Sequence, residues 1–220
     1  MRLCLVLGDQ LKLYSFPPPH PLRSDRYEAF VRLLSERGLP EGASACEPRM
    51  ALREEVQLFH DPEYVDLVER ASRRGWGYLD YGDTPAFPGV YEASLWVVGS
   101  ALRCLEAVAE GEADHAFCPV GGFHHARRDR AAGFCVFNDA AVVISAALER
   151  YGMRRVLYVD IDAHHGDGVM YGFYSDPRVL VADVHEDPRF LYPGTGRRDE
   201  RGAGEAKGTK LNIPLKPGSG

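Results

Sequence analysis

The sequence predicts an α/β fold with three layers, α/β/α, around a mainly parallel sheet. Helical segments alternate with short apolar runs rich in β-branched residues, a pattern typical of parallel strands that helices cover on both faces. Polar clusters follow directly after two of these runs, where open parallel sheets carry their chemistry. With 220 residues the chain can bury one core, so we expect a single domain over residues 1–220.

The first strand is expected at residues 3–7, which are entirely apolar apart from Cys4. The segment 16–21 contains four prolines and therefore forms a loop. Ser24 or Asp25 caps the first helix, whose apolar residues recur at helical spacing until a glycine ends it at position 38.

The second helix begins at Asp61 and Pro62, because proline is favoured at the first helical position. A turn-rich loop over residues 75–89 leads into a long helix at about 92–110, which Gly111 ends.

The apolar run 116–120 predicts a strand that leads into a loop rich in glycine, histidine and arginine. Asn138 then caps a helix that runs to Gly152. Three further strands are expected at 156–160, 179–182 and 211–215.

Composition excludes several classes of function. The net charge of −6 disfavours direct binding to nucleic acid, which requires a basic face. No apolar run approaches the roughly 20 residues of a membrane span, and the apolar start is too short for a secretory signal. We therefore expect a cytoplasmic protein without a membrane partner.

The cysteines point to the same compartment. They are odd in number, irregularly spaced and without a C-x-x-C pair, so we expect neither a disulfide framework nor a cysteine zinc site. The five are Cys4, Cys46, Cys104, Cys118 and Cys135.

The first polar cluster follows the strand at 156–160. Alternate side chains of an extended backbone face the same side, so Asp160, Asp162 and His164 should point one way. A carboxylate and an imidazole two residues apart can bind one zinc ion. The alternative is that these residues form only a helix cap and a polar loop.

The second polar cluster holds two adjacent histidines, His124 and His125, beside glycines and just after the predicted strand 116–120. Two imidazoles can transfer protons near neutral pH. The alternative is a polar surface pair. Because both clusters follow strands of one predicted sheet, we expect them to meet at one sheet edge.

Together these segments resemble the histone deacetylase superfamily, which includes acetoin-utilisation proteins and acetylpolyamine amidohydrolases. The matching motifs are G-G-x-H-H-A at 121–126, G-F-C-x-x-N-D at 133–139, D-x-D-x-H-H-G-D-G at 160–168 and P-G-T-G at 193–196. The resemblance begins near Pro18 and continues to the last residue. It implies an arginase/deacetylase-like fold, in agreement with the predicted parallel sheet.

The resemblance implies that Asp162 and His164 bind Zn²⁺, or Fe²⁺ in its place. Asp160 would help to hold a structural K⁺ or Na⁺ ion. Asp183 stands near that ion, where many relatives have a small hydroxyl residue, so its role there is the weaker expectation. His125 would be the general base and His124 its electrostatic partner and possible proton donor.

The implied substrate is an acetylated amine, either acetyl-lysine or an acetylpolyamine, which is hydrolysed to acetate and free amine. Gly133, Phe134 and Tyr192 would line the tunnel for its acyl-amine arm. Asp83 corresponds, on weaker grounds, to a rim residue that orients the substrate backbone. The sequence does not predict an oligomeric state.

Two parts of the family pattern should lie beyond residue 220: the third zinc ligand, an aspartate, and the tyrosine that donates to the oxyanion. A catalytic zinc normally has three protein ligands. We therefore expect the chain to be C-terminally incomplete as a deacetylase, to expose a sheet edge or an apolar face, and to have little or no activity alone.

Other functions are less consistent with these residues. An arginase-type ureohydrolase needs an acid for its second metal two positions after the histidine, where this chain has Gly166. An inactive binding or regulatory module would not need intact His and Asp/His motifs. A dinucleotide-binding domain would need G-x-G-x-x-G after the first strand, and the motif is missing there.

Overall fold

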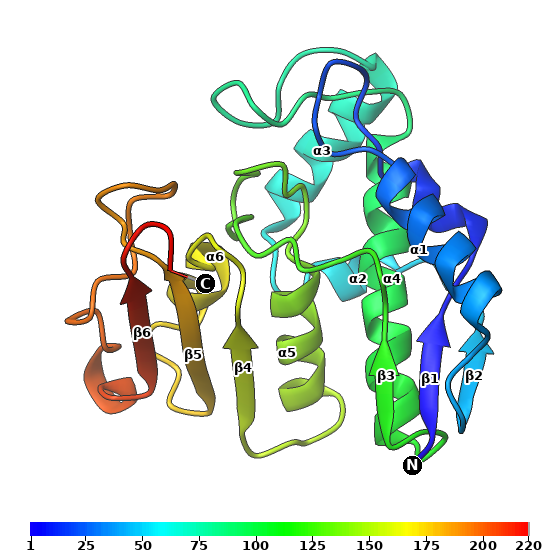
Figure 1. Ribbon diagram of the computed structural model, residues 1–220. Coiled ribbons are helices and arrows are strands. Elements are labelled where there is room, and N and C mark those ends of the chain that lie inside the picture. The colour runs from blue at the N-terminus through cyan, green and yellow to red at the C-terminus, as the bar shows by residue number, and fades with distance from the viewer. Residues whose placement is uncertain (220) are drawn as a thin grey trace. The chain divides into compact units, whose positions relative to one another are not determined.

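The computed structural model describes residues 1–219 and confirms the predicted α/β class with parallel strands and flanking helices (Figure 1). The chain divides into two compact units, Met1–Ala146 and Ala147–Gly220, and the boundary falls within helix α5 (Asp139–Glu149). Each unit contains a three-stranded sheet in which every strand pair is parallel.

The first unit is built on a sheet with strand order β2-β1-β3. Its strands are β1 (Leu3–Val6), β2 (Ala43–Cys46) and β3 (His115–Phe117). Its helices are the 3₁₀ helix η1 (Asp9–Leu13), α1 (Asp25–Arg37), α2 (Arg53–Val56), α3 (Pro62–Arg74), α4 (Val90–Ala109) and most of α5.

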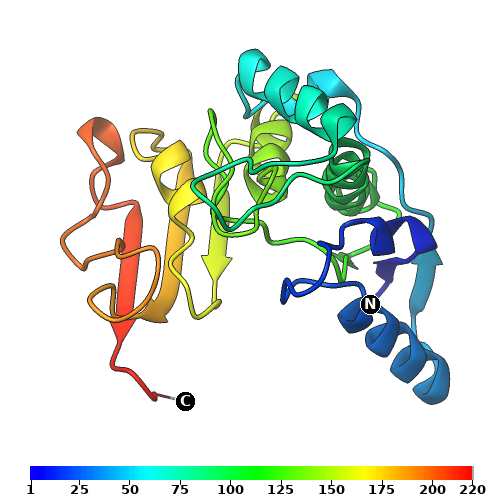
Figure 2. The same cartoon turned by 90° about the horizontal axis from the view of Figure 1, so that it is seen from above.

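Helices α4 and α1 lie on opposite faces of this sheet (Figure 2). On one face, Ala107 of α4 packs with Cys4 and Val6 of β1. On the other face, Phe30 of α1 packs on Phe117 of β3, with 5.8 Å between the ring centres. The first unit therefore has the three layers that the sequence predicts.

The helix ends follow the sequence signals. Pro62 occupies the first turn of α3, and Gly75 ends that helix in the left-handed conformation, with φ of 75°. Asn138 caps α5, because its side-chain Oδ1 accepts the backbone N–H of Ala141 at 2.9 Å.

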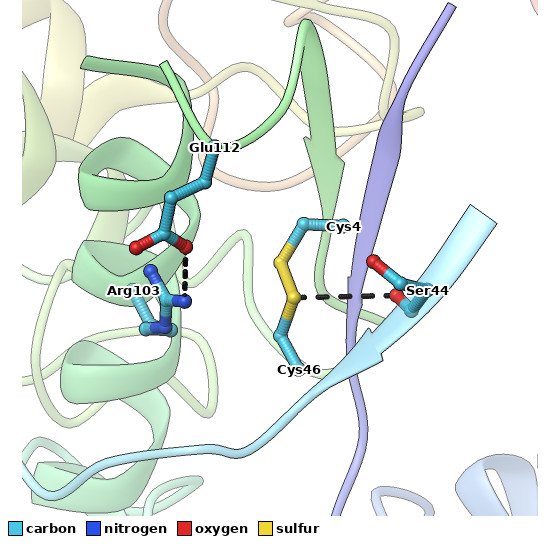
Figure 3. The surroundings of a disulfide bond; sticks show 5 residues. All are labelled: Cys4, Ser44, Cys46, Arg103 and Glu112. Carbon is cyan, nitrogen blue, oxygen red and sulfur yellow. Dashed lines mark hydrogen bonds and ion pairs between the residues drawn. A yellow bond between two sulfur atoms is a disulfide. The ribbon is translucent and has the colours of Figure 1, made fainter. Parts of the chain in front are cut away.

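A disulfide joins Cys4 and Cys46, contrary to the expectation of unpaired cysteines (Figure 3). The two residues are 42 positions apart in sequence, but β1 and β2 are parallel neighbours, and their Cα atoms lie 5.9 Å apart. The pairing could not be predicted from the sequence, because β2 lacks the apolar, β-branched residues by which a strand is recognised. The predicted cytoplasmic location stays a prediction.

The second unit is built on a sheet with strand order β4-β5-β6. Its strands are β4 (Val156–Asp160), β5 (Val179–Glu186) and β6 (Lys210–Leu215). Its helices are α6 (Asp167–Gly172) and the 3₁₀ helix η2 (Gly204–Ala206). Helix α6 lies on one face of this sheet, where Val169 and Met170 are fully buried (Figure 2).

The opposite face of the β4-β5-β6 sheet is open to solvent within the described residues. Leu157 of β4 is 63% exposed and Leu211 of β6 is 52% exposed. Among residues 1–219, helices therefore cover one face of this sheet. The expectation of an exposed apolar face is confirmed.

Among residues 1–219, no helix combines the length and the hydropathy of a membrane span. The longest, α4, has 20 residues but belongs to the core of the first unit.

Candidate metal and catalytic site

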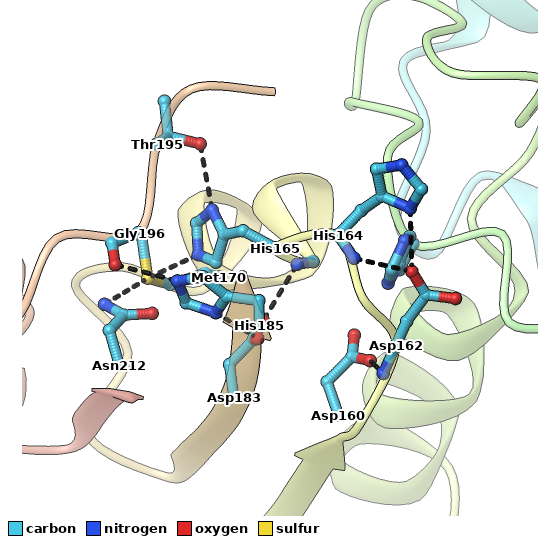
Figure 4. A network of polar contacts seen from close by, with 12 residues as sticks. Asp160, Asp162, His164, His165, Met170, Asp183, His185, Thr195, Gly196 and Asn212 are labelled. Carbon is cyan, nitrogen blue, oxygen red and sulfur yellow. Dashed lines mark hydrogen bonds and ion pairs between the residues drawn. The ribbon is translucent and has the colours of Figure 1, made fainter. Parts of the chain in front are cut away.

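The chain turns sharply after β4, and carboxylates hold each step of the turn (Figure 4). Asp160 Oδ1 accepts the backbone N–H of Asp162 at 3.0 Å, and Asp162 Oδ1 accepts the backbone N–H of His164 at 2.7 Å. These bonds bring the side chains of Asp162 and His164 together, with 3.0 Å between Asp162 Oδ1 and His164 Nδ1.

Asp162 and His164 have the donors and the spacing of two ligands of one zinc ion. The two side chains are hydrogen-bonded at 3.0 Å, and zinc bonds of about 2.0–2.1 Å at a tetrahedral angle would need the same two atoms about 3.3 Å apart, a small movement. Both side chains are partly exposed. Among residues 1–219, no group of three or more His, Cys, Asp or Glu side chains is arranged to hold a metal, so the third ligand is missing.

Asp160 and Asp183 are neighbours on β4 and β5, in direct register and both buried. Asp160 Oδ2 accepts the hydroxyl of Tyr158 at 2.5 Å. Asp183 Oδ2 accepts the backbone N–H of Gly166 at 2.8 Å, and its Oδ1 contacts His185 Nδ1 at 2.6 Å. The pairing of these two carboxylates fits a site for a monovalent cation, although all four of their oxygens already have protein partners.

His185 lies against the carboxylate of Asp183. Its Nδ1 faces the Asp183 carboxylate and its Nε2 faces the carbonyl oxygen of Gly196 at 2.9 Å, so both ring nitrogens face acceptors. Burial alone would lower the pKa of His185, but the hydrogen bonds to Asp183 and Gly196 raise it.

His165 links the same cluster to the loop that follows β5. Its Nδ1 lies 2.9 Å from Thr195 Oγ1, and its ring centre lies 4.8 Å from that of His185. Burial lowers the pKa of His165. This buried network of Asp183, His185, His165 and Thr195 was not predicted from the sequence.

Tyr192 lies on that loop, close to the candidate metal ligands. Its ring is partly exposed and stands edge-on to the ring of His164, with 6.3 Å between centres. The second unit therefore brings together Asp160, Asp162, His164, Asp183 and Tyr192, and the roles expected for these five stay predictions.

The tandem histidines of the first unit are both buried, and their Nε2 atoms lie 3.1 Å apart. At this distance one nitrogen carries a proton and the other accepts it, so the pair can share one proton between two imidazoles. This geometry suits acid–base chemistry and excludes the alternative of a polar surface pair.

The start of α5 holds the loop that carries these histidines. Asn138 Nδ2 donates to the carbonyl oxygens of His124 and Ala126, at 3.2 and 3.0 Å. Asp139 accepts the backbone N–H groups of Gly122 and Phe123, at 2.9 and 2.7 Å. The G-F-C-x-x-N-D motif therefore positions the G-G-x-H-H-A motif.

His60, which lies between α2 and α3, supports the same arrangement. It was not predicted from the sequence. Its Nε2 accepts the backbone N–H of Asn138 at 2.9 Å, and its Nδ1 lies 3.3 Å from the carbonyl oxygen of Arg128. Burial lowers the pKa of His60 to about 3, so this imidazole stays neutral. No motif surrounds His60 in the sequence that would have revealed it.

Asp83 and Phe134 line one cavity of about 430 Å³, together with His20, Tyr78 and the proline-rich loop 17–19. Phe134 follows Gly133 and has a φ of 71°, a strained value for a residue with a side chain. Its backbone N–H donates to Thr84 Oγ1 at 3.1 Å, which ties the two loops together. Asp83, Gly133 and Phe134 are the residues of this unit that the sequence predicts to contact substrate.

Asp80 shapes the turn that presents Asp83. Its Oδ1 accepts the backbone N–H groups of Gly82, Asp83 and Thr84 at 2.9–3.1 Å. Hydrogen bonding to the Asp80 carboxyl raises the pKa of Asp83 to about 6. Asp83 is therefore mostly ionised at neutral pH and can accept a hydrogen bond from a substrate N–H.

The predicted site residues thus form two sets. The first unit carries His124, His125, Asp83, Gly133 and Phe134, and the second carries the candidate metal ligands and Tyr192. Their meeting around one metal ion stays a prediction.

Comparison with known proteins places these motifs in a family. Residues 20–220 match the histone deacetylase domain. Over 217 residues, the chain is 40% identical to the acetoin utilization protein AcuC of Bacillus subtilis; the match covers 96% of this chain and 56% of that relative. The chain therefore spans little more than half the length of this relative.

Solved structures show the same fold. The chain resembles the HD domain of HDA15 with a TM-score of 0.88 and 30% identity, over 97% of this chain and 62% of that one. It also resembles a histone deacetylase homologue complexed with SAHA, with a TM-score of 0.82 and 32% identity, over 98% of this chain and 59% of that one.

Proposed function

The chain belongs to the histone deacetylase family, and we propose that it carries the metal-binding and proton-transfer parts of a zinc-dependent hydrolase that cleaves an acetylated amine to acetate and free amine. One observation supports this proposal above the others: the loop after β4 places Asp162 Oδ1 and His164 Nδ1 3.0 Å apart, as a hydrogen-bonded pair that one metal ion could bridge. The buried tandem histidines provide the accompanying acid–base pair.

Asp162 and His164 would hold Zn²⁺, or Fe²⁺ in its place. The bound ion would polarise the amide carbonyl and acidify a water molecule. Asp160, with backbone oxygens around His164, would hold a K⁺ or Na⁺ ion. Asp183 would contribute less to that second ion, because its carboxylate also contacts the imidazole of His185.

His125 would accept the proton of the attacking water at Nε2. His124 lies 3.1 Å away and would share that proton, which stabilises the charge that develops between the rings. The proton would then pass to the nitrogen as the C–N bond breaks, so that the leaving group departs as a neutral amine rather than as an amide anion.

The substrate would be acetyl-lysine or an acetylpolyamine. Phe134 and Tyr192 would contact its aliphatic arm, and Asp83 would accept an N–H from its backbone. The strained φ of Phe134 supports this role, because backbone strain is concentrated at ligand-binding positions. The structure of a relative in complex with SAHA is consistent with such an arm.

We propose that residues 1–219 alone have little or no activity. They contain no group of three metal ligands, whereas a catalytic zinc normally has three from the protein. Loss of an oxyanion donor alone lowers kcat by about 10²–10³.

A chimera tests the proposed function. It joins this chain to the part of the Bacillus subtilis relative that follows the matched region, and release of acetate is measured from an acetyl-lysine peptide and from an acetylpolyamine, with Zn²⁺ present. We expect turnover by the chimera and none by the chain alone. His125→Phe in the chimera should lower kcat by about 10²–10⁴.

The chimera also separates the rival functions. An active protein with one zinc per chain supports a deacetylase, whereas two manganese ions per chain and hydrolysis of a guanidino substrate would establish a ureohydrolase. If the chimera folds, binds Zn²⁺ and hydrolyses neither acetylated substrate, the proposed function is wrong and a binding role takes its place.

A further inference from the structure

Lys210 is a lysine whose charged end lies in the interior of the second unit. The residue is 1% exposed, although lysine is almost never fully buried unless its ammonium group is paired. Lys210 begins β6 and Val179 begins β5, so the ammonium lies at the amino ends of these strands (Figure 1). The candidate metal ligands follow the carboxyl end of β4, at the opposite edge of the same parallel sheet. The surroundings of Lys210 are therefore a different site.

Three oxygen atoms surround the Lys210 ammonium. Its Nζ donates to the carbonyl oxygen of Val179 at 2.6 Å, to Thr209 Oγ1 at 2.8 Å and to the carbonyl oxygen of Asp176 at 3.2 Å. An ammonium group has three N–H bonds, so each of them has an acceptor. All three acceptors are neutral, because the carboxylate of Asp176 pairs with Arg178 instead. The charge is therefore held by carbonyl and hydroxyl dipoles.

The backbone directs these oxygens at one point. β5 pairs with β6 from Val181 and Lys210 onward, so the carbonyl oxygen of Val179 lies before the first pair of that ladder. The Thr209 hydroxyl donates its proton to the carbonyl oxygen of Ala206 at 2.7 Å, which leaves its lone pairs for the ammonium. Because buried carbonyl groups need a partner, this arrangement favours a cation at the point where the oxygens meet.

Carbonyl and hydroxyl oxygens without a carboxylate suit a monovalent cation. In channels, carbonyl oxygens replace the water around K⁺, and NH₄⁺ is an ion of similar size. A divalent ion is usually bound through carboxylates, which offset its charge. Burial lowers the pKa of Lys210 to about 8, so the side chain still carries its charge at neutral pH.

We propose that these three oxygens form a binding site for a monovalent cation of the ammonium class, and that Lys210 fills it with a cation attached to the chain itself. The amino-terminal edge of the sheet then keeps its cation at any salt composition. Removal of the ammonium should leave a site that free NH₄⁺ or K⁺ enters. This inference does not rest on the proposed function, because none of these residues belongs to the candidate metal and catalytic site.

The first experiment observes the ammonium in the unaltered chain. The lysines of the sequence are Lys12, Lys207, Lys210 and Lys216, so a nitrogen-15 NMR spectrum of the lysine ammonium groups contains few signals. Of these, only Lys210 is buried. Exposed ammonium protons exchange with water too fast to be seen near neutral pH. We therefore expect one protected signal, which Lys210→Met abolishes.

The second experiment tests the site itself. Lys210→Met keeps most of the arm and removes the ammonium. Its unfolding in urea is followed by far-UV circular dichroism in NH₄Cl or KCl, with choline chloride added to keep the ionic strength constant. For a dissociation constant of about 10 mM, an increase in NH₄⁺ from about 1 to about 100 mM should raise the folding equilibrium constant of this variant by about 10-fold.

The matched control is Lys207→Met, which alters an exposed lysine of the same segment. It should respond to NH₄⁺ as the unaltered chain does, so the comparison subtracts any ion bound elsewhere. A protected signal together with a response confined to Lys210→Met supports the proposal. The proposal is overturned if the unaltered chain shows no protected ammonium, or if Lys210→Met responds no more than the control or stays unfolded at every NH₄⁺ concentration.

Discussion

Gly196 shows how one residue without a side chain joins two parts of the candidate site. It has a φ of 90°, and a Cβ atom there would lie 2.6 Å from His165 Cγ and 2.6 Å from His185 Nε2. Its carbonyl oxygen accepts from His185 Nε2. The loop that carries Tyr192 is therefore held against the buried histidines through a position that only glycine fits.

Gly196→Ala should lower the free energy of unfolding of the second unit by about 2–4 kcal/mol, from backbone strain and overpacking combined. The measurement is urea denaturation followed by far-UV circular dichroism. Gly194→Ala is the matched control: it has a similar φ of 79°, but its nearest neighbour would be 3.7 Å away. In this variant the free energy of unfolding should fall by about 1–2 kcal/mol, from backbone strain alone. Equal losses in the two variants would contradict this account.

His60 places a buried neutral imidazole under the loop that carries the tandem histidines. Protonation at Nε2 would break its bond with Asn138, the residue that holds the carbonyl oxygen of His124. Because burial lowers the pKa of His60 from 6.5 to about 3, the unfolded chain binds this proton more readily than the folded chain.

The stabilisation linked to His60 is therefore fully present above pH 6.5 and is lost as the pH falls toward 3. From this group alone, the free energy of unfolding should fall by about 1.4 kcal/mol for each pH unit in that range. His60→Gln keeps an acceptor for Asn138 but cannot titrate. Urea denaturation at several pH values should show a smaller slope in this variant, and an unchanged slope would be inconsistent with the prediction.

At the scale of the element, the disulfide fastens edge strand β2 to β1. The bond closes a loop with a sequence separation of 42 residues. Such a cross-link stabilises a fold mainly because it restricts the unfolded chain.

Reduction of this bond, or Cys46→Ser, should lower the free energy of unfolding of the first unit by about 2–4 kcal/mol. Denaturation with and without dithiothreitol measures the effect. Cys46→Ser itself supplies the control, because the reductant should have no further effect on it. An effect of equal size in that variant would show that another bond is responsible.

Most helices and strands could be predicted because their sequences carry strong local signals. The caps at Asn138 and Gly75 and the apolar run of β4 specify their elements within a few residues. β2 and α6 could not be predicted, because Ala43–Cys46 has little β propensity and Asp167–Gly172 has only one turn and a half of helix. β5 continues to Glu186, beyond the predicted end at 182, because the sheet buries the polar side chains of Asp183 and His185.

The same distinction holds for the site. His124, His125, Asp162 and His164 could be identified because they are adjacent, or nearly so, in sequence and belong to recognisable motifs. Partners from distant segments could not, since the bonds of His60 with Asn138 and of His165 with Thr195 span 78 and 30 residues. Sequence patterns thus identify the reactive groups more readily than the groups that hold them.

At the scale of the whole molecule, the two compact units should not unfold together. The second unit leaves one face of its sheet open, whereas helices cover both faces of the sheet in the first. Both tryptophans, Trp76 and Trp96, lie in the first unit. Tryptophan fluorescence therefore reports on the first unit alone, and far-UV circular dichroism reports on both.

Urea denaturation should begin in the circular dichroism signal before it begins in the fluorescence signal, because the second unit is the less stable one. Dithiothreitol should shift the fluorescence transition to lower urea and leave the first part of the circular dichroism transition in place. Coincident curves from the two probes would show that the molecule unfolds as one cooperative body.

The open sheet face also has a consequence for the life of this protein in a cell. Chaperones and quality-control proteases recognise unburied aliphatic segments, and they remove subunits that lack their counterpart. The steady-state amount of this polypeptide should therefore depend on how long Leu157 and Leu211 stay exposed.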